Sequence, residues 1–319
     1  MSDADYPPYW PASAPSQPIR TDLWIEAALY DPKRGYYRND RREPGADGDF
    51  HTPVHLGGVL GRVLALSLAH SPGVIEVGGG NGKLAKAILT HQPQLLYRVV
   101  DYSRPPPGAP WIQESPESPI SPLRGGTLLG VELLDALPIR RFRKSECIEE
   151  EYWVFDSSWE PQWLPTDEEG SSLFHSVPPG EGILEIRPSL ESLLTTWTRC
   201  VPQGRILFVD YGAPTGWRDS LRGFRGHQQV PPFSKPGYTD WTATVSWKRI
   251  QSLLEKGGWT TEVQTLTLWL LDQVEPLWEE LSFSPQEQLA FKELISPLGL
   301  GETFQVLTAR PVNLSMGSN

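Results

Sequence analysis

A short apolar run that leads into a cluster of glycines constrains the fold of this chain more than any other feature. Val74–Val77 has the length and composition of a buried strand, and residues 83–92 have the spacing of an amphipathic helix. Between them lie the glycines Gly78, Gly79, Gly80 and Gly82. A second apolar run follows at 95–103. Strand, glycine turn, helix and strand within about 30 residues form a βαβ unit, so we predict an α/β fold with a parallel sheet.

The acidic residue before the glycines indicates which ligand the loop binds. Glu76 begins the pattern ExGxGxG, which runs to Gly82. Dinucleotide-binding loops read GxGxxG, so the third glycine stands one position too early for that class. A carboxylate at Glu76 suits a cationic ligand, such as the amino-acid end of S-adenosyl-L-methionine, better than a diphosphate. We therefore predict S-adenosyl-L-methionine as the cofactor, and a nicotinamide oxidoreductase is the more remote alternative.

Asp101 adds a second ligand signal at the end of the next predicted strand. It lies 23 residues beyond Gly78, where an acidic side chain can accept hydrogen bonds from both ribose hydroxyls. NAD sites share this feature, so it indicates a nucleoside without choosing between the two cofactors. The competing interpretation is a tight structural turn with an ordinary surface aspartate.

The remaining pattern extends the α/β alternation along the chain. Helices are predicted over 21–30, 54–70, 189–201, 246–256 and within 275–296, and strands over 127–133, 205–212, 261–271 and 302–310. Residues 105–126 are rich in Pro, Ser and Gly, and we expect no regular element there. We expect residues 213–247 to form a long loop. A polar tract over 141–181 is the best candidate for an insertion.

Composition and charge exclude several classes of function. The net charge of −11 argues against a nucleic-acid substrate, which needs a basic face, and favours cationic partners. No apolar run approaches the length of a membrane span. Cys147 and Cys200 form neither a metal-spaced cluster nor a disulfide framework, so we predict no metal site. The proline-rich N-terminus lacks the features of a secretory or transit peptide, and we expect a cytoplasmic protein.

Five stretches together resemble the MidA-like methyltransferases, a family that includes a mitochondrial complex I assembly factor that methylates an arginine. They are YDPKRGYY at 30–37, GDFHT at 48–52, the glycine loop at 76–82, ELLDALP at 132–138, and VDYG at 209–212 with LRGFRGH at 221–227 and PGYTDWTA at 236–243. The similarity is collinear over residues 21–250. Each stretch alone is weak, but their order makes the resemblance specific.

The resemblance implies a class I (Rossmann-like) S-adenosyl-L-methionine-dependent methyltransferase core with an N-terminal helical cap and an inserted segment. The implied division is a disordered or wrapping arm over 1–20, the cap over 21–72, the core over 73–140 and 182–312, and the insertion over 141–181. The implied substrate is an arginine of a partner protein, such as a subunit of a respiratory complex. The implied cofactor-binding residues are Asp49, Thr52, Glu76, Gly78, Gly80, Gly82 and Asp101, with Asp49 and Thr52 in the cap.

The catalytic residues implied are Glu132, Asp135, Asp210 and His227. Carboxylates can grip a guanidinium through paired hydrogen bonds and orient one of its nitrogens. A histidine can accept the released proton, because it titrates near neutral pH. The alternatives are structural: Asp135 could cap a helix, Asp210 could anchor the turn that follows it, and His227 could be a hydrogen-bonded loop residue.

Two departures from the family pattern bear on substrate and activity. His55 stands where the family has a glutamate, and Val131 stands where it has an asparagine. Both changes remove expected polar groups from the substrate side of the site. They leave open a methyltransferase with another substrate, or a non-catalytic S-adenosyl-L-methionine-binding assembly factor or scaffold.

Overall fold

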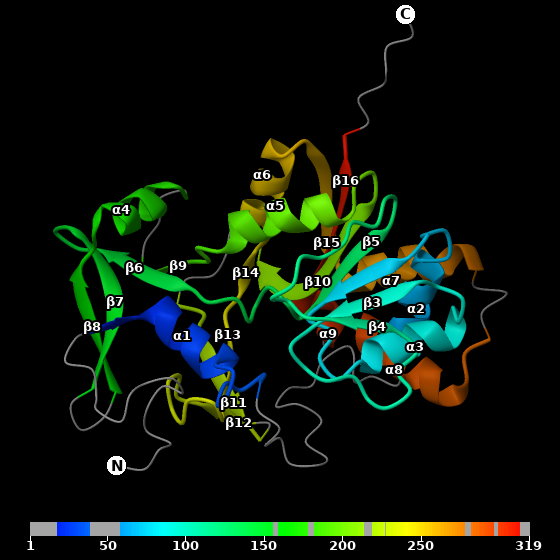
Figure 1. Ribbon diagram of the computed structural model, residues 1–319, viewed down its shortest axis with the longest axis horizontal. Helices are drawn as coiled ribbons and strands as arrows, with labels where there is room; N and C mark the ends of the chain where they lie inside the picture. The colour runs from blue at the N-terminus through cyan, green and yellow to red at the C-terminus, as the bar shows by residue number, and fades with distance from the viewer. Residues whose placement is uncertain are drawn as a thin grey trace, which may run out of the picture. The chain divides into compact units, whose positions relative to one another are not determined.

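The structure is a computed structural model that describes residues 18–38, 58–155, 159–177, 182–213, 219–226, 228–277, 282–296 and 299–312 (Figure 1). The chain divides into two compact units, each assembled from separated stretches. Unit 1 comprises Met1–His51, Asp135–Leu190 and Ala213–Ser246. Unit 2 comprises Thr52–Leu134, Glu191–Gly212 and Trp247–Asn319.

Unit 2 is built on a mixed sheet with the strand order β15-β16-β10-β5-β2-β3-β4. Its strands are β2 (Val74–Val77), β3 (Tyr97–Val100), β4 (Ile112–Glu114), β5 (Thr127–Val131), β10 (Arg205–Ala213), β15 (Trp259–Thr265) and β16 (Phe304–Pro311). The run from β10 to β4 is parallel, whereas β16 is antiparallel to both β10 and β15. The prediction of a parallel α/β sheet is therefore confirmed.

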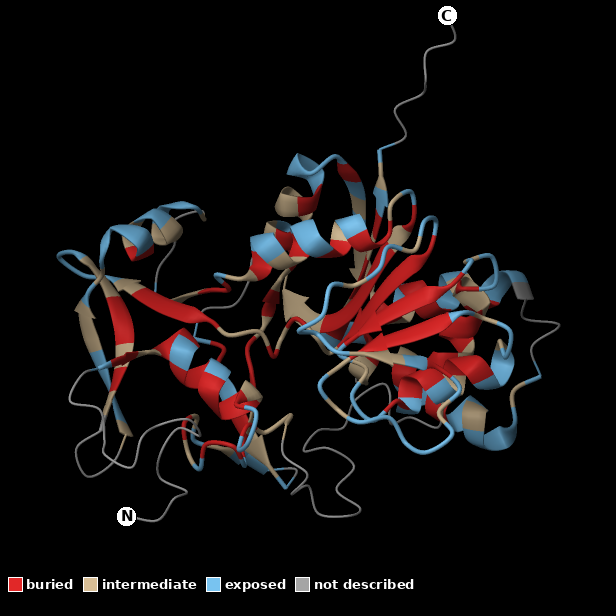
Figure 2. Cartoon of the chain, in the orientation of Figure 1, coloured by how far each residue is buried: buried red, intermediate tan, exposed pale blue. Residues whose placement is uncertain are grey.

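Helices cover both faces of this sheet (Figure 1). They are α2 (Val59–Ser67), α3 (Lys83–His91), α5 (Leu190–Cys200), α6 (Trp247–Lys256), α7 (Leu266–Val274), α8 (Pro285–Ile295) and α9 (Leu300–Thr303), with a 3-10 turn at Glu275–Leu277. Leu207 belongs to the core shared with α2, α3, α7 and α8, while Phe208 meets Trp197 of α5 on the other face. Successive side chains of a strand point to opposite faces, so β10 is buried on both sides (Figure 2).

Unit 1 combines two small antiparallel sheets with a buried helix. Its elements are β1 (Ile19–Arg20), α1 (Thr21–Tyr30), β6 (Arg140–Lys144), β7 (Ile148–Phe155), β8 (Trp159–Pro165), α4 (Glu168–His175), β9 (Leu184–Ile186), β11 (Arg222–Arg225), β12 (Gln228–Val230), β13 (Asp240–Thr242) and β14 (Val245–Ser246). One sheet has the order β1-β7-β6-β9 with β8 on β7, and the other has the order β12-β11-β13. Trp24 and Ile25 of α1 pack in a core with Trp153, Phe233 and Trp241.

Several elements differ from the predictions made from sequence. Residues 105–126 contain β4, and residues 213–247 contain β11, β12 and β13 instead of a continuous loop. The apolar run 261–271, predicted as one strand, is the end of β15 followed by α7. Thr265 caps this helix by accepting a hydrogen bond from the Leu268 N–H, and this polar cap lies inside the apolar run.

The units also cut across the predicted division into cap, core and insertion. Helix α2, expected in the cap, contributes Leu60, Val63 and Leu64 to the core of unit 2. Helix α1 lies in unit 1 with the predicted insertion and with residues 213–246. Burial explains the placement of α2, because its apolar face is complementary to that of α3.

Candidate functional site

The sheet of unit 2 changes direction between β2 and β5. From β2 the chain proceeds outward through β3 to β4, whereas β5 and β10 lie on its other side. Open α/β sheets bind ligands in the crevice outside the carboxyl ends of the strands at such a switch point. The glycine loop follows β2 and Glu132 follows β5, so both lie at this edge. Contact between the two segments is direct, since a Cβ added to Gly78 would lie 2.9 Å from Leu133 Cδ1.

The glycines of the loop serve different purposes. Gly78, Gly80 and Gly82 all have positive φ, near 75°, 55° and 75°. A Cβ at Gly82 would lie 2.2 Å from the Trp111 ring, and one at Gly79 would lie 2.6 Å from Val99. A Cβ at Gly80 would meet no atom of the described residues within 4 Å. Internal packing therefore restricts Gly78, Gly79 and Gly82, and Gly80 is the position where the loop opens outward.

Asp101 closes the loop from the end of β3. Its Oδ2 accepts a hydrogen bond from the Gly80 N–H at 2.9 Å, and its Oδ1 accepts one from the Ser103 N–H at 2.7 Å. The Ser103 hydroxyl donates in turn to the Gly80 carbonyl. A carboxylate has about four lone-pair positions, so Asp101 retains capacity for further donors such as ribose hydroxyls.

Glu76 lies beneath the loop and not on its open face. The residue is 2% exposed, and its Oε2 accepts a hydrogen bond from the Tyr97 hydroxyl at 3.0 Å. Burial raises the pKa of Glu76 to about 7, against the opposing effect of the Tyr97 hydrogen bond. Its predicted contact with the cofactor ammonium stays a prediction. In the structure, the buried Glu76 carboxyl packs against the loop at Gly79.

Glu132 and Asp210 are joined through the backbone of their two strands. The Glu132 N–H donates to the Val209 carbonyl at 2.9 Å, and Glu132 has a φ of 52°. Asp210 is 1% exposed, and its carboxylate accepts from the N–H groups of Leu134 at 2.8 Å and Tyr211 at 2.9 Å. These bonds anchor the turn that follows Asp210, as the structural alternative for this residue predicted. Glu132 is held in a left-handed conformation that glutamate rarely adopts, and such outliers cluster at functional sites.

Asp135 belongs to unit 1, where it contacts the end of the fifth family stretch, at Thr242 and Ala243. Its Oδ2 accepts a hydrogen bond from Thr242 Oγ1 at 2.7 Å, and its carbonyl accepts from the Ala243 N–H at 3.1 Å. Burial raises the pKa of Asp135, while the Thr242 hydrogen bond and the charge of Arg187 oppose the shift. Asp135 begins no helix in the structure, so the helix-cap alternative has no support.

Three residues of unit 1, Tyr30, Tyr37 and Asp240, were not among the predicted site residues. The Tyr37 hydroxyl donates to Asp240 Oδ1 at 2.6 Å, and the Tyr37 ring stacks on Tyr30 with centroids 5.6 Å apart. The Tyr30 hydroxyl donates to the Ala136 carbonyl at 3.0 Å. Tyr30, Tyr37 and Asp240 all lie in the stretches that carry the family resemblance. Their presence in those stretches was the available signal that they belong to the site. Unit 1 therefore contains the stretch at 30–37 and the later parts of the fourth and fifth stretches.

Three predicted site residues lie outside the described residues: Asp49, Thr52 and His227. Their roles stay predictions. Within the part of the chain that the structure describes, no three His, Cys, Asp or Glu side chains are grouped so as to hold a metal ion. Among these same residues, no helix has both the length and the apolar character needed to cross a membrane.

Comparison with known families decides the class of protein. Residues 104–265, half of the chain, match the model of a family described as an S-adenosyl-L-methionine-dependent methyltransferase. The chain belongs to this family. The matched residues include Glu132, Asp135 and Asp210, whereas the glycine loop precedes them.

Two curated proteins illustrate the similarity of this methyltransferase over a longer range. The protein arginine methyltransferase NDUFAF7 homolog, mitochondrial, of Caenorhabditis elegans is 24% identical over 307 residues, which cover 75% of this chain and 69% of that protein. The protein arginine methyltransferase NDUFAF7, mitochondrial, of Danio rerio is 24% identical over 368 residues, covering 90% and 82%. Both alignments extend well beyond the family match.

Solved structures confirm the fold of the methyltransferase. A COG1565 superfamily member from Burkholderia thailandensis bound to S-adenosyl-homocysteine has a TM-score of 0.79 at 23% identity, covering 92% of this chain and 88% of that chain. A native structure of a COG1565 superfamily protein from the same organism has a TM-score of 0.77 at 22% identity, covering 92% and 87%. The predicted class I methyltransferase fold is therefore confirmed.

The loop geometry fits the cofactor that this family uses, S-adenosyl-L-methionine. The open space at Gly80 and the half-exposed Asp101 carboxylate supply a flat backbone surface and an acceptor for hydroxyl donors at the switch point. Glu76, Gly78, Gly80, Gly82 and Asp101 all belong to this one loop or to the strands that flank it. The nicotinamide alternative and the non-catalytic scaffold lose their support, because the matched family is one of methyltransferases.

Proposed function

We propose that this methyltransferase transfers a methyl group from S-adenosyl-L-methionine to a guanidinium nitrogen of an arginine in a partner protein. The observation that carries the proposal is the position of Glu132, a carboxylate in a strained conformation at the carboxyl end of β5, beside the glycine loop. The names of the two curated relatives, both protein arginine methyltransferases, point to the same chemistry.

The residues of the site have distinct parts in this proposal. When bound, S-adenosyl-L-methionine supplies the electrophilic methyl group. Glu132 orients the guanidinium by accepting two hydrogen bonds, which is the geometry in which carboxylates bind arginine most strongly. Asp210 keeps the segment after β5 in place through the Leu134 N–H and so acts as a positioning residue. Holding the acceptor nitrogen in line with the methyl group supplies much of the rate enhancement.

Substitution of Glu132 tests the proposal. The Glu132→Gln variant is expected to bind S-adenosyl-L-methionine as the wild type does and to methylate protein arginine about 100-fold more slowly, because an amide accepts only one of the two charge-assisted bonds. Incorporation of labelled methyl groups into proteins of a cell extract depleted of this methyltransferase measures the rate, and mass spectrometry identifies the methylated residue.

A matched substitution serves as the control. Glu262→Gln removes an exposed carboxylate from β15 of the same unit and is expected to leave the rate unchanged. Methylation at wild-type rate in Glu132→Gln would remove Glu132 from the mechanism. A label found on residues other than arginine would contradict the proposal that arginine is the methylated residue.

The partner and the cellular location are parts of the same proposal. The resemblance to MidA-like proteins supports a subunit of a respiratory complex as the partner, and the net charge of −11 favours a basic segment on it. Cys147 and Cys200 are both free thiols, which is in keeping with a reducing cytoplasm. Imaging of a fluorescent fusion tests the location, and an extracellular or organellar signal would contradict it.

A further inference from the structure

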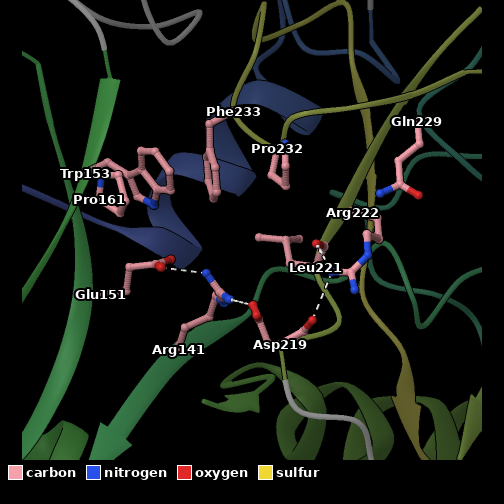
Figure 3. Close-up of a pocket in the computed structure, with 10 residues that line it drawn as sticks. All are labelled: Arg141, Glu151, Trp153, Pro161, Asp219, Leu221, Arg222, Gln229, Pro232 and Phe233. Carbon is pink, nitrogen blue, oxygen red and sulfur yellow. Dashed lines mark hydrogen bonds and ion pairs between the residues drawn. The ribbon is translucent and has the colours of Figure 1, made fainter. Parts of the chain in front are cut away.

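Unit 1 contains a cavity of about 320 Å³, and none of the catalytic or cofactor-binding candidates that the structure describes lines it (Figure 3). Its lining residues are Arg141, Glu151, Trp153, Pro161, Asp219, Leu221, Arg222, Gln229, Pro232 and Phe233. All of them belong to unit 1. Ligand pockets in proteins span roughly 300–1,000 Å³, so this cavity is sized for a single long side chain.

One end of the cavity is aromatic and rigid. The Trp153 and Phe233 rings are stacked with centroids 3.5 Å apart, and Phe233 also packs against Trp241 and Trp24. The Trp153 Nε1–H donates to Thr21 Oγ1 at 3.2 Å, so its polar edge is satisfied and its ring forms the wall. Pro161 and Pro232 add to this apolar lining (Figure 3).

The other end is charged, and carboxylates predominate there. The Arg141 guanidinium contacts Glu151 at 2.6 Å, Glu185 at 3.2 Å and also Asp219. The side chains of Glu151 and Glu185 are 4% and 2% exposed, whereas that of Asp219 is 63% exposed. Three carboxylates around one guanidinium leave negative charge in excess. Asp219 is the carboxylate of this group that solvent, and therefore a guest, can reach.

The second arginine of the lining does not reverse this balance. Arg222 is exposed, and its guanidinium donates to the backbone carbonyls of Asp219 and Leu221, each at 2.9 Å. Glu151 and Asp219 line the cavity, and Glu185 lies behind Arg141 outside the lining, so three carboxylates stand against the two guanidiniums of Arg141 and Arg222. The charges therefore favour a cation with an apolar stem.

Backbone strain singles out one lining residue. Asp219 and Phe233 both have positive φ, 56° and 69°. Aspartate tolerates this left-handed region, but it costs a bulky aromatic residue roughly 1–2 kcal/mol. The fold thus holds the aromatic wall at Phe233 against its own preference, as proteins do at ligand-binding sites.

We propose that this cavity docks a basic side chain of the protein substrate, with its methylene stem against Trp153 and Phe233 and its charged head at Asp219. Long basic side chains combine these two characters, and cations are attracted to aromatic faces as well as to carboxylates. The identity of the partner as a substrate rests on the proposed function, and the docking chemistry rests on the cavity alone. The substrate would then carry a second basic residue besides the methylated arginine.

Binding of short blocked peptides tests the proposal without any methyl transfer. The probes are acetyl-Gly-Arg-Gly-amide, its citrulline analogue, which is nearly isosteric but uncharged, and its glutamate analogue, each titrated into the full chain without cofactor. Saturation-transfer NMR reports the affinity. We expect the arginine peptide to bind about fivefold more tightly than the citrulline peptide, the effect of one exposed ion pair.

Two variants locate the binding. Asp219→Asn keeps the left-handed backbone, which asparagine tolerates. In the Glu132→Gln background, which removes the guanidinium contact proposed at the other site, Asp219→Asn is expected to lower the affinity of the arginine peptide to that of the citrulline peptide. Asp272→Asn makes the same charge change at an exposed position of α7 in unit 2 and is expected to change nothing. Circular dichroism confirms that both variants are folded.

The outcomes separate this proposal from the proposed function. Arginine binding that depends on Asp219 supports the docking site even if no arginine is found methylated in the extract assay. Equal binding of the arginine and citrulline peptides, tighter binding of the glutamate peptide, or unchanged affinity when Asp219→Asn is added to the Glu132→Gln background would each overturn it.

Discussion

Gly80 and Gly82 lie two positions apart in one loop but have different surroundings. Gly82 is pressed against the Trp111 ring, while none of the described residues occupies the space outside Gly80. A glycine-rich motif is usually taken as a signature of ligand contact along its whole length. Here glycine is required at position 82 by the protein's own packing and at position 80 by the space that the ligand needs. Substitutions at the two positions should therefore have different effects.

Substitution of these glycines should separate folding from cofactor binding. Gly80→Asn is expected to preserve stability, since asparagine tolerates positive φ, and to weaken S-adenosyl-L-methionine binding about tenfold or more by filling the open space. Gly82→Ala is expected to destabilise the fold by about 3 kcal/mol, because a Cβ there collides with Trp111 in a left-handed conformation. Calorimetric titration and urea unfolding measure the two effects. A Gly80→Asn variant with unchanged affinity would place the cofactor elsewhere.

Glu76 makes stability depend on pH in a defined direction. Its pKa is about 7 in the folded chain and 4.5 without perturbation, so the folded state favours the protonated carboxyl. This stabilisation is complete below pH 4.5 and is lost as the pH rises through 7, an effect of about 3 kcal/mol. The Glu76→Gln variant is expected to lack that decline.

Urea unfolding of both proteins at pH 5 and pH 8 measures the difference. Other titrating groups cancel in the comparison of wild type with variant. The exposed Glu262→Gln variant is expected to follow the wild-type decline. Parallel pH profiles of the wild type and Glu76→Gln would show that burial leaves the Glu76 carboxyl unperturbed.

At the scale of elements, α2 and α3 approach each other closely at one point. A Cβ added to Gly61 of α2 would lie 2.4 Å from the Ala87 Cβ of α3. Gly61→Ala is therefore expected to cost about 1–3 kcal/mol, in spite of the better helix propensity of alanine. The double variant Gly61→Ala/Ala87→Gly is expected to be more stable than the sum of the single changes predicts, since the collision is removed. Additive free energies of unfolding in this cycle would contradict the close approach.

Elements were predictable from sequence where one face or one turn determines them. The βαβ unit at β2, α3 and β3 follows from local periodicity and from the glycines, and the structure confirms it. The boundary between β15 and α7 was missed, because Leu266–Val274 is apolar enough for a buried strand and only the cap at Thr265 reveals the helix. The strands β11, β12 and β13 were missed since they pair only with one another, at short length, within a stretch rich in turn residues.

At the scale of the whole molecule, the chain passes between the two units five times. The cofactor-binding half of the site was predictable because its residues lie close in sequence, around β2 and β3. Tyr37 and Asp240 could not be paired from sequence by physical reasoning, since 203 residues separate them. Their proximity follows from the tertiary fold, and a family pattern was the only signal for either of them.

The residues that pack against α1 are translated long after it, so the order of synthesis bears on how this protein folds. Thr21 hydrogen-bonds Glu151, and the Trp24 ring lies 4.9 Å from Trp241, so the helix completes its core only with residues translated much later. At roughly 5–20 residues per second, the interval between Trp24 and Trp241 is about 10–45 s. During that time the apolar face of a nascent α1 lacks the part of its native cover that Phe233 and Trp241 supply. Ribosome-associated chaperones would find a binding segment there until Trp241 is translated.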